Sequence, residues 1–344
     1  MLTHIDKNNL PTMVDVSHKD FSIRMAKAES KIQLPAEVKP FLSGSEINLK
    51  KGPVFQTAII AGTMAAKKTY EVIPFCHQIP LESCKFDICI DEQLLVTISC
   101  QVKTSFKTGV EMEALHGATV AALTIYDMCK AVSHNIVLKE TKLILKTGGK
   151  NTVLDRPTYG LVLTGGKSER MGEPKALIQY HGKSHAKFIW DTLSPYCKET
   201  FLSARQGQWV GSELELLPAI IDKYENAGPI GAMLSAFSEH PDANWIVVAC
   251  DLIHFNKSTV EKLLANYNPE VAATAFKNTE KDFPEPLCTL YTPLAQTAFL
   301  DAFKSQVSCP VKVLRDQNVE LITQDNGISL TNINTQEERK YAVN

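Results

Sequence analysis

The spacing of hydrophobic and polar residues changes character near the middle of the 344-residue chain. The first part mixes period-two alternation, typical of strands with one buried face, with period-3.6 repeats typical of amphipathic helices. The pattern predicts, in order, an edge strand at 13–17 (MVDVS), a helix from about Phe55 to Tyr70, a hairpin of strands 85–90 and 94–102, a helix from about Leu115 to Val132 and a strand at 142–146. Antiparallel strands interspersed with helices predict an α+β domain.

The second part alternates short apolar runs with helical patterns. Such runs are typical of strands that are buried on both faces. The predicted elements are a strand at 161–163, a helix around 187–193, strands at 200–204 and 217–222, a helix that opens at 228–233 and a strand at 244–250. This order predicts a doubly wound, Rossmann-like α/β domain with a mostly parallel sheet.

A polar stretch with glycines and a proline, residues 147–158, lies between the two patterns and reads as a short linker. We therefore expect one domain at 1–150 and a second at 151–344. Hydrophobic residues make up 44% of the chain and charged residues 22%, so each domain has enough apolar side chains for its own core.

The charge, the hydrophobic runs and the cysteine spacing argue against several classes of protein. The net charge of −2 argues against a general nucleic-acid binder, and no apolar run of 18 residues predicts a membrane span. The nine cysteines form no CxxC pair, and the first residues lack the apolar stretch of a signal peptide. We expect a cytoplasmic protein with reduced thiols that binds small molecules.

Several polar residues in the first part could do acid–base chemistry. Asp127 and Lys130 are three apart, so they share one helical face in an otherwise apolar segment. Glu111 and Glu113 are two apart and would share one face of an extended backbone. His77 follows Cys76 in a loop. A buried salt bridge explains Asp127 and Lys130 equally well, and a lone histidine beside a thiol in a loop is more often structural or incidental. The pattern alone therefore names no reaction.

Six segments of the first part resemble cyclic pyranopterin monophosphate synthase of molybdenum cofactor biosynthesis. In chain order they are MVDVS, KKGPVFQTAIIAGTMAAKKT, IPFCH, KTGVEMEAL, AALTIYDMCKA and KTGGK, and they cover nearly all of residues 10–150. The resemblance implies a ferredoxin-like fold and a homo-oligomer, expected to be a hexamer formed through this domain. It also implies conversion of 3′,8-cyclo-7,8-dihydro-GTP to cyclic pyranopterin monophosphate with release of pyrophosphate.

The same resemblance assigns roles to residues of this sequence. Lys51 and Lys130 would be the general acid and base, with nearby cations lowering a lysine pKa, and Asp127 would orient Lys130. His77 and Arg24 would hold phosphates. The remaining expected residues are Glu111 and Glu113 as catalytic groups and Cys76, Met112 and Lys146 as substrate contacts. Gln78 stands where the family usually has proline, which leaves the direction of His77 less fixed.

In the second part, a glycine-rich loop follows the first buried strand. Gly165 and Gly166 let the backbone approach an anion, and Arg170 and Lys175 supply positive charge. The spacing fits neither the GxxxxGK[ST] phosphate loop nor the GxGxxG dinucleotide fingerprint. Asp222 and Asp251 follow two further strands, and ligands of open α/β sheets gather at such strand ends. The pattern therefore predicts a nucleotide site.

The run LVLTGGKSERMGEPKALI resembles the nucleotidyltransferase signature LAGGxSxRMGxxKxLL. Together with VID, GPIGAM, VVACDL, Glu285-Pro286-Leu287 and LTNINTQEE, it is similar to molybdenum cofactor guanylyltransferase over about 159–340. The resemblance implies GTP as substrate, Mg²⁺ held by Asp251, and Asn332 and Asn334 near the pterin. The implied nucleotide-binding residues are Leu163, Thr164, Gly165, Gly166, Arg170, Lys175, Asp222 and Asp251. Ser203-Ala204-Arg205 departs from the family, which often has Asn before the Arg.

Together these resemblances predict a bifunctional enzyme, a lyase followed by a nucleotidyltransferase that transfers GMP to molybdenum-molybdopterin. Two alternatives remain for the second domain. It could be a cytidylyl- or sugar-phosphate nucleotidyltransferase, since these share most of the motifs, or a non-catalytic nucleotide-binding scaffold. The two reactions are not consecutive, so we expect no direct channelling between the sites.

Overall fold

The computed structural model describes residues 10–148, 152–165, 174–180, 182–224, 227–278, 283–324 and 330. The chain divides into two compact units, Met1–Leu154 and Asp155–Asn344, and the division falls inside the predicted linker. Within the described residues, no helix combines the length and apolar character needed to cross a membrane. All nine cysteines are free thiols.

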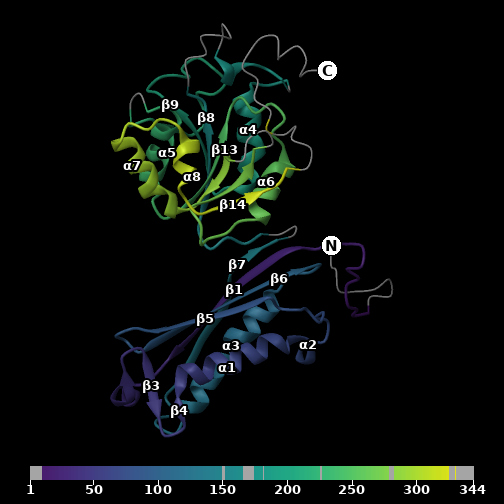
Figure 1. Ribbon diagram of the computed structural model, residues 1–344, viewed down its shortest axis with the longest axis vertical. Helices are drawn as coiled ribbons and strands as arrows, with labels where there is room; N and C mark the ends of the chain where they lie inside the picture. The colour runs from purple at the N-terminus through teal and green to yellow at the C-terminus, as the bar shows by residue number, and fades with distance from the viewer. Residues whose placement is uncertain are drawn as a thin grey trace. The chain divides into compact units, whose positions relative to one another are not determined.

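The first unit is built on a four-stranded antiparallel sheet covered by helices (Figure 1). The strands are β1 (Ser22–Gln33), β5 (Ser83–Ile90), β6 (Leu95–Phe106) and β7 (Val137–Thr147), in the order β5-β6-β1-β7. The helices are α1 (Val54–Lys67), α2 (Thr69–Val72) and α3 (Glu111–Cys129). Between β1 and α1 lie η1 (Ala36–Phe41) and a small sheet of β2 (Leu42–Ser43), β3 (Glu46–Leu49) and β4 (Gly52–Pro53). The unit is α+β, as expected.

Two glycines bring α1 and α3 into close contact over the sheet. A Cβ atom at Gly62 would lie 2.8 Å from the carbonyl oxygen of Gly117 and 2.5 Å from the ring of Phe86. Real Cβ atoms essentially never come that near a backbone oxygen, so only glycine permits this approach. The packing fixes the direction of α3, whose two ends carry the candidate catalytic residues.

Two local expectations for the first unit are wrong, and one strand was not predicted. Residues 13–17 do not form a strand. The central strand β1 was not expected, because its inward side chains include the small residues Ala26 and Ala28 and the polar Ser30. Glu111 and Glu113 lie in the first turn of α3 instead of on an extended backbone, because the helix begins at Glu111.

The second unit contains a seven-stranded mixed sheet in the order β10-β9-β8-β11-β13-β12-β14. Four neighbouring pairs are parallel, and β13 runs antiparallel to both of its neighbours. The strands are β8 (Thr158–Leu163), β9 (Thr200–Ala204), β10 (Ala219–Ile221), β11 (Asn244–Ala249), β12 (Ala273–Lys277), β13 (Pro284–Tyr291) and β14 (Val319–Ile322). The expected mostly parallel sheet is present, with one reversed strand.

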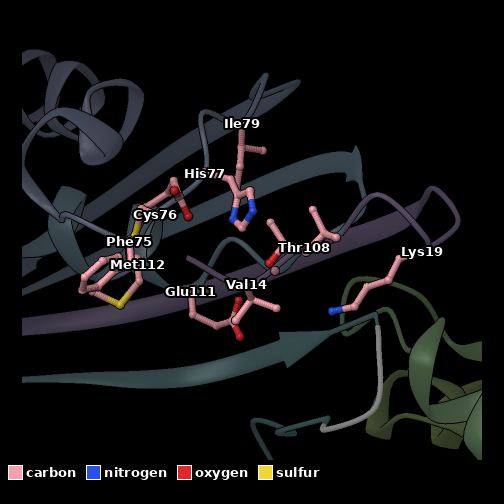
Figure 2. Close-up of a pocket in the computed structure, with 12 residues that line it drawn as sticks. Val14, Lys19, Phe75, Cys76, His77, Ile79, Thr108, Glu111 and Met112 are labelled. Atoms are coloured by element: carbon pink, nitrogen blue, oxygen red, sulfur yellow. The ribbon is translucent and has the colours of Figure 1, made fainter. Parts of the chain in front are cut away.

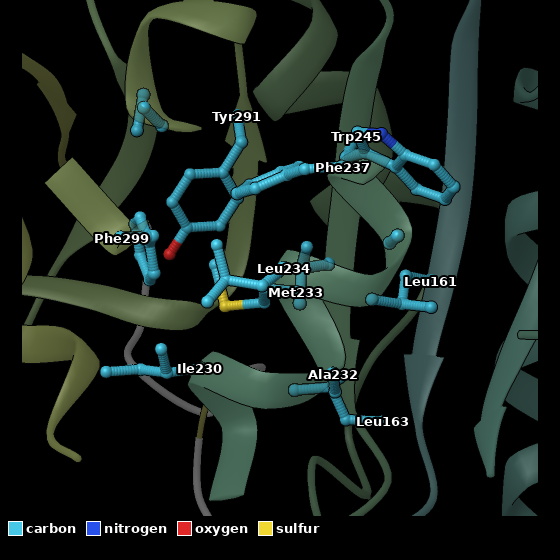
Figure 3. Packing of buried hydrophobic residues seen from close by; sticks show 14 of the residues in the cluster. Leu161, Leu163, Ile230, Ala232, Met233, Leu234, Phe237, Trp245, Tyr291 and Phe299 are labelled. Atoms are coloured by element: carbon cyan, nitrogen blue, oxygen red, sulfur yellow. The ribbon is translucent and has the colours of Figure 1, made fainter. Parts of the chain in front are cut away.

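Helices cover both faces of this sheet. Figure 1 shows α5 (Gly228–Glu239), α7 (Gln296–Lys304) and α8 (Pro310–Arg315) on one side, with α4 (His185–Leu193) and α6 (Lys257–Ala265) on the other. Short turns η2 (Lys175–Leu177), η3 (Ser194–Tyr196) and η4 (Pro293–Ala295) join the larger elements. A fully buried core that includes Leu161, Phe237 and Trp245 packs under α5 and α7 (Figure 3). This packed core holds the sheet in place. It therefore fixes the carboxyl ends of the strands β8, β9, β10 and β11 relative to one another.

Candidate active sites in the two units

A pocket of about 330 Å³ opens at the amino end of α3 in the first unit. His77 and Glu111 lie on different sides of it, and Cys76 and Met112 contribute to its wall (Figure 2). The loop between α2 and β5 supplies Cys76 and His77, and the first turn of α3 supplies Glu111, Met112 and Glu113. The structure thus brings together five of the expected residues.

A second, larger basin of about 810 Å³ shares Glu111 with this pocket. Its wall carries the expected Arg24 and Lys146 and also Lys19 and Lys107, which the sequence analysis missed. Lys146 pairs with the carboxylate of Glu111, and Arg24 Nε donates to the carbonyl of Phe106 at 3.4 Å. Four cationic side chains face three carboxylates in this basin, those of Asp15, Asp20 and Glu111, so it offers cations to an anionic ligand with a small positive excess.

Burial shifts the pKa values of two side chains in the pocket, Glu113 and Cys76. Glu113 is only 4% exposed, and desolvation, with a smaller contribution from the charge of Glu111, raises its pKa to about 7. Burial and the negative charges of Glu113 and Glu111 raise the pKa of the Cys76 thiol. Cys76 therefore stays a neutral thiol at physiological pH, and Glu113 can hold or release a proton there.

The expected acid–base residues form a separate cluster at the other end of α3. Lys130 Nζ lies 2.7 Å from Asp127 Oδ1, and Lys51 Nζ lies 3.5 Å from Asp127 Oδ2. The hydrogen bond with Lys130 lowers the pKa of Asp127, and the same bond raises the pKa of Lys130. The expectation of a lowered pKa is therefore wrong for Lys130 in a single chain, because its nearest partner is an anion and not a cation.

The two clusters lie far apart within one chain. Asp127 is sixteen positions after Glu111 on α3, and a rise of 1.5 Å per position puts them about 24 Å apart along the helix axis. No small substrate spans that distance.

In the second unit, the described nucleotide residues lie at the carboxyl ends of strands within the parallel run β10-β9-β8-β11. Thr164 is buried and Gly165 is exposed directly after β8, while Asp222 follows β10 and Asp251 follows β11. The Leu163 carbonyl already accepts the Cys250 N–H at 3.2 Å, and the Thr164 carbonyl accepts Gln208 Nε2 at 3.3 Å. Gly165 is therefore the residue of this turn whose backbone faces solvent.

Hydrogen bonds tie Asp222 to the turn after β8. Its Oδ1 accepts from Ser203 Oγ at 2.9 Å, and the Ser203 carbonyl accepts from Thr164 Oγ1 at 2.5 Å. Burial raises the pKa of Asp222, and the bond from Ser203 opposes that effect. Ser203, Gln208 and Trp209 all belong to this network, and the sequence analysis assigned them no role.

Asp251 combines burial with an unused oxygen. Its Oδ2 lies 3.6 Å from Lys175 Nζ, whereas Oδ1 is buried with no hydrogen-bond partner among the described residues. Burial raises the pKa of Asp251, and the charge of Lys175 opposes that effect. The described part of the chain holds no group of three or more His, Cys, Asp or Glu side chains arranged around a metal position. A hard carboxylate oxygen without a partner nevertheless fits Mg²⁺ when the other ligands are phosphate and water.

Gly166, Arg170, Asn332 and Asn334, which the sequence analysis also expected in this site, lie outside the described residues.

Two family models match separate parts of the sequence. Residues 13–149 match the MoaC family, and residues 160–317 match the MobA-like NTP transferase domain. Each match lies within one of the two units.

Whole-chain similarity joins the two matches. A molybdenum cofactor biosynthesis bifunctional protein from Synechocystis sp. is 52% identical over 98% of this chain and 99% of its own. A cyclic pyranopterin monophosphate synthase from Xanthomonas axonopodis is 51% identical over 44% of this chain and 92% of its own. A solved molybdopterin-guanine dinucleotide biosynthesis protein A from Archaeoglobus fulgidus aligns with 54% of this chain and 96% of its own at 24% identity, with a TM-score of 0.46. The chain belongs to the family of bifunctional molybdenum cofactor biosynthesis proteins, with a MoaC domain followed by a MobA-like NTP transferase domain.

Proposed function

We propose that the first unit converts 3′,8-cyclo-7,8-dihydro-GTP to cyclic pyranopterin monophosphate with release of pyrophosphate. The observation that carries the proposal is the 52% identity to a bifunctional relative over nearly the whole of both chains. The element order of the unit, strand–helix–strand–strand–helix–strand around an antiparallel sheet, supports a ferredoxin-like fold. The nine free thiols support a cytoplasmic location.

The roles of the side chains follow from their charges and burial. Arg24 and Lys146 in the larger basin and His77 in the neighbouring pocket would hold substrate phosphates. Lys130 and Lys51 would move protons, with Asp127 orienting both amines. Glu113, with a pKa of about 7, would exchange a proton within the pocket.

These roles require two copies of the chain. The lysine cluster and the His77 pocket lie about 24 Å apart along α3, so one substrate reaches both only if a second chain contributes one of them. We therefore propose a homo-oligomer formed through the first unit, with a hexamer as the expected assembly. Mixing inactive Lys130→Ala chains with inactive His77→Ala chains tests this, because hybrid sites regain both groups. If the mixture stayed as inactive as its components, shared sites would be refuted.

For the second unit we propose transfer of GMP from GTP to molybdenum-molybdopterin. Gly165 and Asp222 would contact the nucleoside, and Lys175 would neutralise the triphosphate. Asp251 would hold Mg²⁺, which supplies positive charge where pyrophosphate departs. With phosphate bound, Lys175 would exchange Asp251 for a phosphate oxygen, since Lys175 Nζ and Asp251 Oδ2 are 3.6 Å apart, longer than a hydrogen bond.

Two full-length variants test both activities. Lys130→Ala should fail to restore molybdoenzyme activity in cells lacking the synthase but should restore it in cells lacking the guanylyltransferase. Asp251→Ala should do the reverse. Lys142→Ala is the matched control for the first variant, because Lys142 also pairs with a surface carboxylate, Glu140, but has no contact with the cluster of Lys51, Asp127 and Lys130 among its ion pairs. Comparing GTP with CTP by titration calorimetry separates the guanylyl assignment from a cytidylyl one.

A further inference from the structure

A segment behind the turn after β8 holds that turn in place. We call it the clamp segment, residues 205–216, which lies between β9 and β10. Trp209 Nε1 donates to Thr164 Oγ1 at 3.2 Å, and Gln208 Nε2 donates to the Thr164 carbonyl at 3.3 Å. The hydroxyl and the carbonyl of Thr164 therefore both accept hydrogen bonds from side chains of the clamp segment.

The hydroxyl of Thr164 is committed to the protein. It accepts from Trp209 and donates to the Ser203 carbonyl at 2.5 Å, and Thr164 is 4% exposed. Trp209 is itself 8% exposed. A buried hydroxyl that serves as both donor and acceptor has no further proton to offer a ligand, so its task is to fix the turn.

Gln208 is fixed in turn by the start of the same segment. Its Oε1 accepts the backbone N–H of Arg205 at 2.9 Å, which orients the side-chain amide toward Thr164. This bond within the clamp segment therefore fixes the orientation of the Gln208 side chain.

The same network reaches Asp222. Ser203 links Thr164 to Asp222 through its carbonyl and its hydroxyl, which donates to Asp222 Oδ1 at 2.9 Å. A Cβ atom built on Gly165 would lie 3.8 Å from Asp222 Oδ2, so this second oxygen borders the exposed glycine. The positions of Gly165 and Asp222 are therefore set relative to each other before any ligand arrives.

We propose that Gln208 and Trp209 are positioning residues of the nucleotide site, holding Thr164 so that the Gly165 backbone and the Asp222 carboxylate face the nucleoside in a preset arrangement. The proposal rests on the proposed function of the second unit. Preset groups bind more tightly because less ordering is required on binding. The hydrogen bonds of this network end on Thr164, Ser203, Arg205 and Asp222, on the nucleoside side of the proposed site, so we expect the clamp to act on nucleotide binding and not on the transfer step.

Trp209→Phe in the full-length chain removes the indole N–H and keeps an aromatic ring. One net hydrogen bond corresponds to about a three- to tenfold rise in KM and Kd for GTP, with kcat changed by less than about twofold. Gln208→Met, which removes the amide and keeps the length, should act in the same direction. Trp190→Phe is the matched control, because Trp190 Nε1 also donates to a backbone carbonyl of the same unit, that of Thr200 at 2.8 Å. Thr200 begins β9 and pairs with Gly160, so this bond lies at the opposite end of the parallel β8–β9 pair from the turn.

Hydrogen exchange of the ligand-free chain tests the clamp without any nucleotide. The amides of 163–165 should exchange faster in Trp209→Phe and Gln208→Met than in wild type, and in Trp190→Phe the same amides should match wild type. Unchanged exchange in both clamp variants, an equal effect of Trp190→Phe, or a loss confined to kcat would each overturn the clamp. A wild-type chain that fails to bind GTP would instead refute the proposed guanylyl function, and the exchange result would still decide the clamp.

Discussion

Glu113 offers the sharpest test of the electrostatics in the first unit. Its carboxyl is 4% exposed in the first turn of α3, and burial raises its pKa to about 7 from the ordinary value of 4.5. The folded chain therefore binds this proton more tightly than the unfolded chain does. The resulting stabilisation is fully present below pH 4.5 and is lost as the pH rises through about 7.

The magnitude follows from the shift. A difference of about 2.5 pKa units at 1.36 kcal/mol per unit gives about 3 kcal/mol lost between pH 4.5 and pH 8. Glu113→Gln keeps the shape of the protonated side chain and cannot ionise. The variant should therefore match wild type near pH 4.5 and exceed it in the free energy of unfolding by about 3 kcal/mol at pH 8.

The assay must see the first unit alone. All three tryptophans, Trp190, Trp209 and Trp245, belong to the second unit. Tryptophan fluorescence therefore does not report the unfolding of the first unit. Native-state hydrogen exchange of β1 and β6 amides, corrected for intrinsic rates and measured at equal protein concentration, reports the required free energy. Amides of β8 and β11 serve as the internal control and should not respond. A difference between variant and wild type that is the same at both pH values would refute the reasoning.

Three further changes probe other features. Gly62→Ala should destabilise the first unit by about 1–3 kcal/mol in the same exchange assay, because its Cβ would lie 2.8 Å from the Gly117 carbonyl; an effect near zero would mean that α1 can shift away. Asp127→Asn should lower synthase kcat by about 10²- to 10⁴-fold while thermal unfolding stays unchanged, since both paired lysines lose an exposed partner that orients them; a parallel loss of stability would indicate a structural role instead. Lys175→Met should raise the KM for GTP by about tenfold or more through the loss of one charge-assisted contact with the triphosphate, and an unchanged KM in steady-state kinetics would remove Lys175 from the site.

The sequence predicted the helices and strands that have strong hydrophobic periodicity. It missed features that depend on pairing with other strands. Helix α1 and the hairpin of β5 and β6 follow directly from apolar spacing. Strand β1 is central yet rich in alanine and charged residues, so its burial comes from pairing with β6 and β7 and leaves a weak pattern in the sequence. Strand β13 reverses direction in an otherwise parallel sheet, and apolar content carries no information about strand direction.

The candidate sites show the same limit. Motifs indicated Asp251 and Lys175, and the structure has them in contact. Trp209 and Gln208 lie in a segment without hydrophobic periodicity. Their proposed role depends on hydrogen bonds to Thr164, about 45 positions earlier in the chain, and a sequence pattern does not show such contacts. Lys130 shows a different limit. The sequence already placed Asp127 on the same helical face, but the direction of the pKa shift depends on whether this anion or a nearby cation dominates, and in the structure the hydrogen bond and charge of Asp127 dominate and raise the pKa of Lys130.

The division of the first site along α3 has a consequence for the whole chain. If the synthase site needs His77 from one copy and Lys130 from another, dilution below the dissociation constant of the oligomer removes synthase activity. The guanylyl site draws its described residues from one unit of one chain, so its specific activity should not depend on dilution. Measuring both activities on one sample across a dilution series, alongside its mass by light scattering, compares them directly. Parallel loss of the two activities would show that the second site also depends on assembly, and two constant activities in a sample that has become monomeric would show that the first does not.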